Sequence, residues 1–91
     1  MVYKNGLVMI LLVKEASEIV LKLRKGEVPY AMSLYHSWLN NLFSEINSDH
    51  MESFLPLFEE MLKAQEARNY VWLADLIEYI LIDSIKSIYK I

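Results

Sequence analysis

The amino-acid sequence predicts an all-α protein, an antiparallel four-helix up-down bundle formed by a single domain over residues 1–91. Apolar residues recur with the 3.6-residue period of amphipathic helices in every segment, and no window alternates with a period of two. The few Gly and Pro residues fall near expected helix ends, with connections of two to five residues between them, which favours antiparallel neighbours. A chain of 91 residues supports one hydrophobic core and is too short for two.

The first helix is expected over about residues 7–25, with Gly6 at its start. The uncharged run 7–13 is far shorter than the roughly 20 residues that span a bilayer, and Lys14 and Glu15 follow it without a small-residue cleavage pattern. We therefore interpret this run as the first turns of a buried helix in a cytoplasmic protein. Its inward residues are Leu12, Ala16, Ile19, Val20 and Leu23.

Gly26 marks the end of the first helix, because it follows the basic residues Arg24 and Lys25, as is common at a helix C-terminus. Pro29 has the fixed φ angle that suits the first turn of a new helix. The second helix is therefore predicted over about residues 29–46, with a short connection at 26–28. Its inward residues are Ala31, Tyr35, Trp38, Leu39, Leu42 and Ile46.

The third helix is predicted over about residues 49–68, after a turn at 47–52. Pro56 allows two interpretations: it lies in the first turn of a helix capped by Ser53, or inside a helix that starts near Asp49 and bends there. The residues expected on the inward face are Met51, Phe54, Leu55, Phe58, Met61 and Leu62.

The fourth helix is predicted over about residues 70–89 and is apolar on nearly all sides. Its apolar face is expected to hold Leu73, Leu76, Ile77, Ile80, Leu81, Ser84, Ile85 and Ile88. At 100° per residue the centre of this inward face is formed by Leu73, Ile77, Ile80, Ser84, Ile88 and Ile91. Apolar residues also fall on the outward half, namely Val71, Trp72, Tyr79, Ile82 and Tyr89. A helix of this kind is either central in its fold or covered by a partner.

Composition excludes several function classes. The chain has no Cys and a formal net charge of −3, which is the wrong sign for a protein that binds the phosphate backbone of nucleic acids. No glycine-rich phosphate loop or Glu-x-x-His metal pair is present, so we expect no enzyme, no cofactor and no metal. A small-ligand or metal protein that uses His36, His50 and the nearby Glu45 and Asp49 is the alternative from another class.

Two surfaces are candidates for protein contact. Residues 28–44 contain no Asp, Glu, Lys or Arg, which resembles the core of an interface. The outward apolar residues of the fourth helix are the second candidate. We therefore expect a protein-interaction or assembly module, most simply a homodimer that uses neither nucleic acid nor a membrane. The expected contact residues are Trp72, Asp75, Tyr79, Ile82 and Tyr89 on the fourth helix, or Ser37 and Asn40 on the second.

Charge is distributed unevenly along the chain. Residues 1–26 carry five basic and two acidic groups, whereas residues 45–83 carry nine acidic and two basic groups. Packing of the first helix against the third or fourth would bring these charges together, and the same asymmetry would orient a partner.

The stretch from Ala67 to Tyr79 resembles a run, roughly N-x-D-Y-V-x-L-A-D-L-L-E-Y-E-L, in a family of small uncharacterised helical bacterial proteins. Asn69 stands where the run has Asp and retains an N-capping oxygen, whereas Ile80 stands where the run has Glu. The resemblance implies a bacterial cytoplasmic protein without assigned activity. In size and helical architecture the chain is also similar to flagellar or secretion export chaperones, which hold a helix of their partner.

Overall fold

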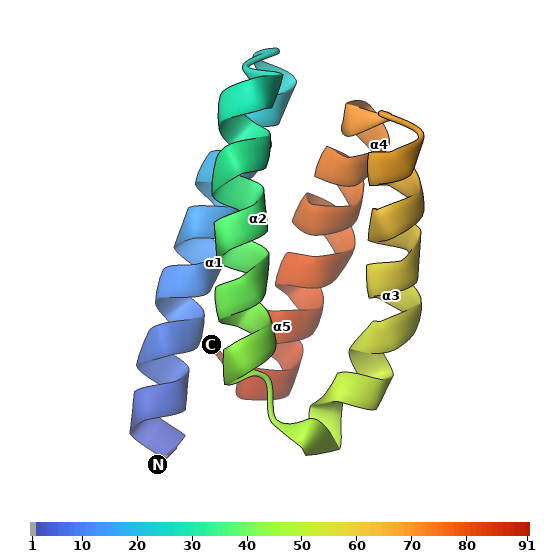
Figure 1. Cartoon of the computed structure of the whole chain (residues 1–91). Helices are drawn as coiled ribbons and strands as arrows, with labels where there is room; N and C mark the ends of the chain where they lie inside the picture. Colours follow the sequence, from blue (N-terminus) through green and yellow to red (C-terminus); the bar gives the residue numbers. More distant parts are fainter. Residues whose placement is uncertain (1) are drawn as a thin grey trace.

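Four helices make up the part of the chain that the computed structural model describes, which is residues 2–91 for the backbone and 6–91 for the side chains. They are α1 (Val2–Arg24), α2 (Val28–Glu45), α3 (Ser48–Glu66) and a C-terminal helix in three parts, α4 (Tyr70–Asp75), the π-helical segment η1 (Leu76–Leu81) and α5 (Ile82–Tyr89) (Figure 1). No strand occurs in these residues, so the predicted all-α class is confirmed.

The α1–α2 connection has the predicted glycine-terminated form. Gly26 adopts a positive φ of 82°, its N–H donates to the carbonyl of Leu23 at 3.1 Å, and the N–H of Glu27 donates to that of Lys22 at 3.0 Å. These two bonds satisfy carbonyls that the helix end leaves free, and a positive φ is adopted most readily by glycine. Pro29 lies in the first turn of α2, as predicted.

The α3–C-terminal helix connection has the same form without a glycine. Arg68 occupies the left-handed region with φ 55°, and the N–H of Asn69 donates to the carbonyl of Ala64 at 2.8 Å. The side chain of Asn69 then caps the next helix, because its Oδ1 accepts from the N–H of Trp72 at 3.1 Å. The capping role expected of Asn69 is therefore confirmed.

The start of α1 differs from the sequence-based expectation, and the position of Pro56 in α3 decides between the two interpretations given above. The helical backbone of α1 begins at Val2 and continues through Gly6, which therefore does not mark the start of the helix. Pro56 lies inside α3, which resolves the two interpretations in favour of a helix that begins before it. In Figure 1 the first turns of α3 run obliquely before the helix straightens.

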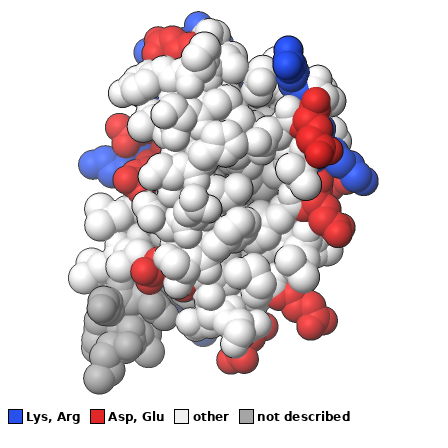
Figure 2. Space-filling model, viewed as in Figure 1, with Lys and Arg blue, Asp and Glu red and all other residues white. Residues whose placement is uncertain are grey.

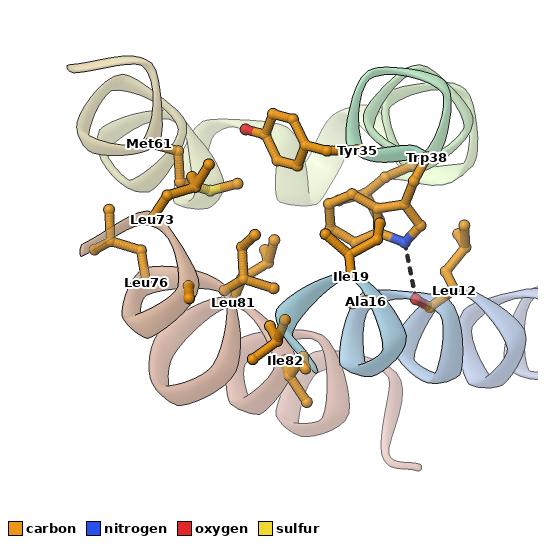
Figure 3. Packing of buried hydrophobic residues seen from close by; sticks show 14 of the residues in the cluster. Leu12, Ala16, Ile19, Tyr35, Trp38, Met61, Leu73, Leu76, Leu81 and Ile82 are labelled. Carbon is orange, nitrogen blue, oxygen red and sulfur yellow. Dashed lines mark hydrogen bonds between the residues drawn. The ribbon is translucent and has the colours of Figure 1, made fainter. Parts of the chain in front are cut away.

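The helices are arranged around α1 and the C-terminal helix. Helix α1 packs against α2 and along all three parts of the C-terminal helix, whereas α3 packs against α4 and η1. In Figure 3, α2 and α3 lie on one side of the buried side chains, and α1 and the C-terminal helix lie on the other. The core between them includes Trp38, whose indole N–H donates to the carbonyl of Leu12 at 2.8 Å.

The π-helical segment η1 changes which residues of the C-terminal helix face the core. A π-helical turn contains one more residue than an α-helical turn, so the residues after it are rotated relative to an uninterrupted α-helix. Ile80 and Ser84, expected at the centre of the inward face, are 47% exposed and half-buried respectively. Ile82, expected outward, is buried. The predicted centre of the inward face is therefore wrong beyond Ile77, because the prediction assumed a single α-helix, whereas Leu81 and Ile85, which were also expected to face inward, are fully buried.

No helix in the described residues is long and apolar enough to cross a lipid bilayer.

Candidate docking surface

Asp75, the carboxylate of the expected contact strip (Trp72, Asp75, Tyr79, Ile82 and Tyr89), and its neighbour Glu78 already have a partner within the chain. Nη2 of Arg24 lies 2.9 Å from Oδ1 of Asp75 and 2.7 Å from Oε1 of Glu78. Hydrogen bonds to Glu78 and to Asp75 raise the pKa of the Arg24 guanidinium. This contact joins the basic end of α1 to the acidic C-terminal helix, and it confirms internal pairing of the unevenly distributed charges for these three residues.

The aromatic residues of the strip differ in exposure. Tyr79 is 63% exposed, and its ring centroid lies 6.0 Å from the Arg24 guanidinium. Trp72 is half-buried and packs against the core. Val71, beside it in sequence, is 71% exposed. Val71 and Tyr79 of the C-terminal helix therefore remain exposed, and Tyr79 lies beside the ion pair.

The remaining members of the strip, Ile82 and Tyr89, do not lie on this surface. Ile82 is 7% exposed and belongs to the core, which corrects the expectation that it faces outward. Tyr89 also packs against the core. Its ring lies edge-to-face with that of His50 at 5.7 Å, and its hydroxyl accepts from the N–H of Asn47 at 3.4 Å. Because of η1, the five residues do not form one continuous outward strip.

The second expected contact surface, α2, presents Ser37 and Asn40 to solvent, as predicted. Ser37 lines a groove of about 320 Å³ between α1 and α2, together with charged residues of α1 such as Glu18 and Lys22. Asn40 is exposed as well, but it lines neither this groove nor the groove between α2 and α3.

An apolar groove of about 290 Å³ separates α2 from α3. The two helices have little backbone contact, and they meet through the rings of Phe43 and Phe58, whose centroids lie 4.8 Å apart, edge to face. Phe43, Leu55 and Leu62 line the groove and are 39%, 49% and 53% exposed. Figure 2 shows this side of the molecule as a broad uncharged face, with charged side chains mostly at its edges.

Tyr35 is one of the buried residues that line this groove. Its side chain extends from α2 with the hydroxyl directed toward α3 (Figure 3), and only 1% of the residue is exposed. Burial raises the pKa of Tyr35 to about 12. No residue among 6–91 forms a hydrogen bond with this hydroxyl, and it is not sealed from solvent, so it is a polar group that the groove makes accessible from outside.

Sequence reasoning placed the groove residues of α3 in the core. Leu55 and Leu62 were expected on its inward face, yet each is about half exposed. The inward face proposed for α3 is broader than one packing seam, since only Phe54 and Met61 of that set are fully buried. An apolar face on α3 that is wider than one packing seam, next to the uncharged helix α2, is the sequence feature that indicates a contact surface on α3.

The alternative metal or small-ligand site is not assembled among the described residues. No three His, Asp or Glu side chains there lie close enough to hold one metal ion, which includes Glu45, Asp49 and His50. His36 and His50 instead pack edge-to-face against Tyr35 and Tyr89, at centroid distances of 5.6 and 5.7 Å.

Comparison of the chain with protein-family models, with curated proteins and with solved structures finds no significant match.

Proposed function

We propose that this protein is a protein-interaction module that binds a partner on the α2–α3 groove. The single observation that supports the proposal is the groove itself: Phe43, Leu55 and Leu62 remain partly exposed on a face without charged residues at its centre. Depletion of charge together with aromatic residues is typical of the centre of an interface. We also infer the antiparallel up-down arrangement of the bundle, because its connections are short.

The energy available from such contact is considerable for a protein of this size. Completing the burial of three half-exposed apolar side chains contributes roughly 1 kcal/mol each, or about 3 kcal/mol in all. A standard interface takes about 800 Å² from each partner. Because the whole surface measures 5875 Å², an interface of that size requires a face that spans α2 and α3 rather than one helix edge.

A groove between two helices suits a third helix better than a flat surface, because side chains of an amphipathic helix enter the groove at every third or fourth position. This shape favours the export-chaperone or adaptor alternative over simple face-to-face pairing. Bacterial origin and a cytoplasmic location stay predictions from the sequence.

Site-specific photo-crosslinking in the cells that produce the protein tests the proposal. A photoreactive amino acid at position 62, inside the groove, is expected to give a defined protein adduct. The same probe in place of Lys86, an exposed residue of α5 that does not line the groove, is the matched control. Leu55→Glu in the position 62 probe protein should remove the adduct. Equal adducts from both positions, or none from position 62, would contradict the proposal.

Self-association through the C-terminal helix is a second candidate, and the exposure of Val71 and Tyr79 next to half-buried Trp72 supports it. Light scattering over a range of concentrations should then give twice the monomer mass, and Tyr79→Ala should return the monomer without loss of helicity, because a central aromatic residue contributes more than about 1 kcal/mol. Ser37→Glu is the control on a different groove. A monomer at high micromolar concentration would refute this candidate.

A further inference from the structure

One edge of the α2–α3 groove is acidic and the other is neutral. On α3, Glu52, Glu59 and Glu66 are exposed and follow one another at intervals of seven residues. Leu55 and Leu62 have the same spacing, so helix geometry places the three carboxylates in a row beside the two leucines. The neutral edge belongs to α2, which carries no charged residue from Val28 to Ser44.

Within residues 6–91, the carboxylates of this row have no cation as partner. Lys63, the basic residue of the last turn of α3, pairs with Glu60 at 3.1 Å. Among residues 6–91 no Lys or Arg forms an ion pair with Glu52, Glu59 or Glu66. Asp75 and Glu78, by contrast, share Arg24. Within the described residues, the row thus differs from Asp75 and Glu78 in that its carboxylates have no cation partner. A cation of another molecule could pair with them.

The groove floor supplies a second, independent feature. The Tyr35 hydroxyl is directed into the groove from a side chain that is 99% buried, and it has no hydrogen-bond partner in the described part of the chain. A hydroxyl is a donor and an acceptor, so a partner that fills the groove with apolar atoms alone would leave this group unsatisfied. A polar atom of the partner at this depth is therefore favoured.

We propose that the groove binds an amphipathic helix of another protein, one with an apolar seam and a row of Lys or Arg residues, seven apart, along one edge of that seam. Seven residues rise about 10.5 Å along a helix, so basic residues at this interval match Glu52, Glu59 and Glu66. The arrangement is that of the charged positions that flank the seam of a coiled coil. This inference rests on the proposed function, which it deepens by naming the chemistry of the partner.

A second copy of the chain fits less well. The exposed apolar residues of α1 include Leu7, Ile10, Leu11 and Leu21, and two acidic residues, Glu15 and Glu18, lie between Leu11 and Leu21. These two acidic residues would approach the acidic row, which costs energy. A helix from a different protein, with a basic edge throughout, avoids this repulsion.

Two designed 21-residue helical peptides test the inference against the full-length protein. Both have the same Leu seam, and one has Lys, the other Glu, along the edge. Isothermal titration calorimetry should show at least tenfold tighter binding of the Lys peptide, with a loss of this preference at high salt. Leu62→Glu should abolish binding. Circular dichroism of this variant should be unchanged, because Leu62 is 53% exposed.

Matched variants separate a specific site from general attraction between opposite charges. Glu59→Lys should weaken the Lys peptide at least fivefold, whereas Asp83→Lys, the same change of charge on an exposed residue of α5, should leave affinity within a factor of two. Tyr35→Phe should lower the affinity for both peptides a few-fold.

Equal affinity for the two peptides, or equal weakening by Glu59→Lys and Asp83→Lys, would overturn the inferred partner chemistry. The proposed function would still stand if Leu62→Glu blocked both peptides or if position 62 still crosslinked a cellular protein. If Leu62→Glu left peptide binding unchanged and Leu55→Glu left the crosslink from position 62 unchanged, both proposals would be refuted.

Discussion

Replacing Ile82 by Lys and, separately, Ile80 by Lys tests the rotation that η1 introduces. An uninterrupted α-helix would bury Ile80 and expose Ile82, whereas the structure buries Ile82 to 7% exposure and leaves Ile80 47% exposed. Burial of an Ile side chain contributes about 1.5–3 kcal/mol, and a lysine at the edge of the core has to extend its ammonium group toward water. We expect Ile82→Lys to lower the free energy of unfolding by about 3 kcal/mol and Ile80→Lys by less than about 1 kcal/mol.

Thermal and urea denaturation followed by far-UV circular dichroism measures the difference. At roughly 4–8 °C per kcal/mol for a domain of this size, Ile82→Lys should lower Tm by about 12–24 °C, and Ile80→Lys by less than about 8 °C. Each variant is the control for the other, because both introduce the same side chain into the same helix. A larger effect at Ile80, or equal effects, would refute the π-helical register.

Three further predictions concern Tyr35, the two helix ends and the ion pair. The pKa of Tyr35 is about 12 in the folded protein and 10 in the unfolded chain, so the unfolded chain loses this proton first. The free energy of unfolding should therefore be constant below about pH 10 and should fall by about 2–3 kcal/mol as the pH rises to 12. Urea titrations at several pH values measure this decrease, which Tyr35→Phe should remove. Arg68→Gly should stabilise the protein by about 0.5–1 kcal/mol and Gly26→Ala should destabilise it by about 1 kcal/mol, because both positions have a positive φ. Thermal scans in which both variants shifted Tm in the same direction would contradict this. A double-mutant cycle on Arg24 and Glu78 should give a coupling energy of about 0.5–1 kcal/mol that decreases in about 1 M NaCl, since both groups are partly exposed; a larger, salt-independent value would indicate a buried pair instead.

Much of the fold follows from local features of the sequence. Gly26, Pro29 and Asn69 place the helix ends by their backbone and capping properties, which depend only on neighbouring residues. The π-helical segment could not be predicted in this way. Its extra residue allows Leu81, Ile82 and Ile85 to pack together in the core, and that gain depends on helices elsewhere in the chain.

The candidate site was predictable only in part. The absence of charge on α2 made this helix a candidate contact surface, and Tyr35, Leu39 and Phe43 of α2 line the groove. Periodicity, however, shows which face of a helix is apolar and does not show how far apart two helices lie. Leu55 and Leu62 therefore appeared to be core residues, although the separation of α2 from α3 leaves them exposed.

The one-sided attachment of α3 has a consequence for motion. Helix α1 is held by α2 and by the whole length of the C-terminal helix, whereas α3 packs mainly on α4 and η1, and meets α2 mainly at Phe43. Segments with few packing partners open more often than the rest of a protein, and their amide protons exchange sooner. Amide protons of α3 should thus exchange with deuterium before those of α1. Each opening of α3 would widen the groove, so the rate of local opening would set the rate at which the partner helix binds.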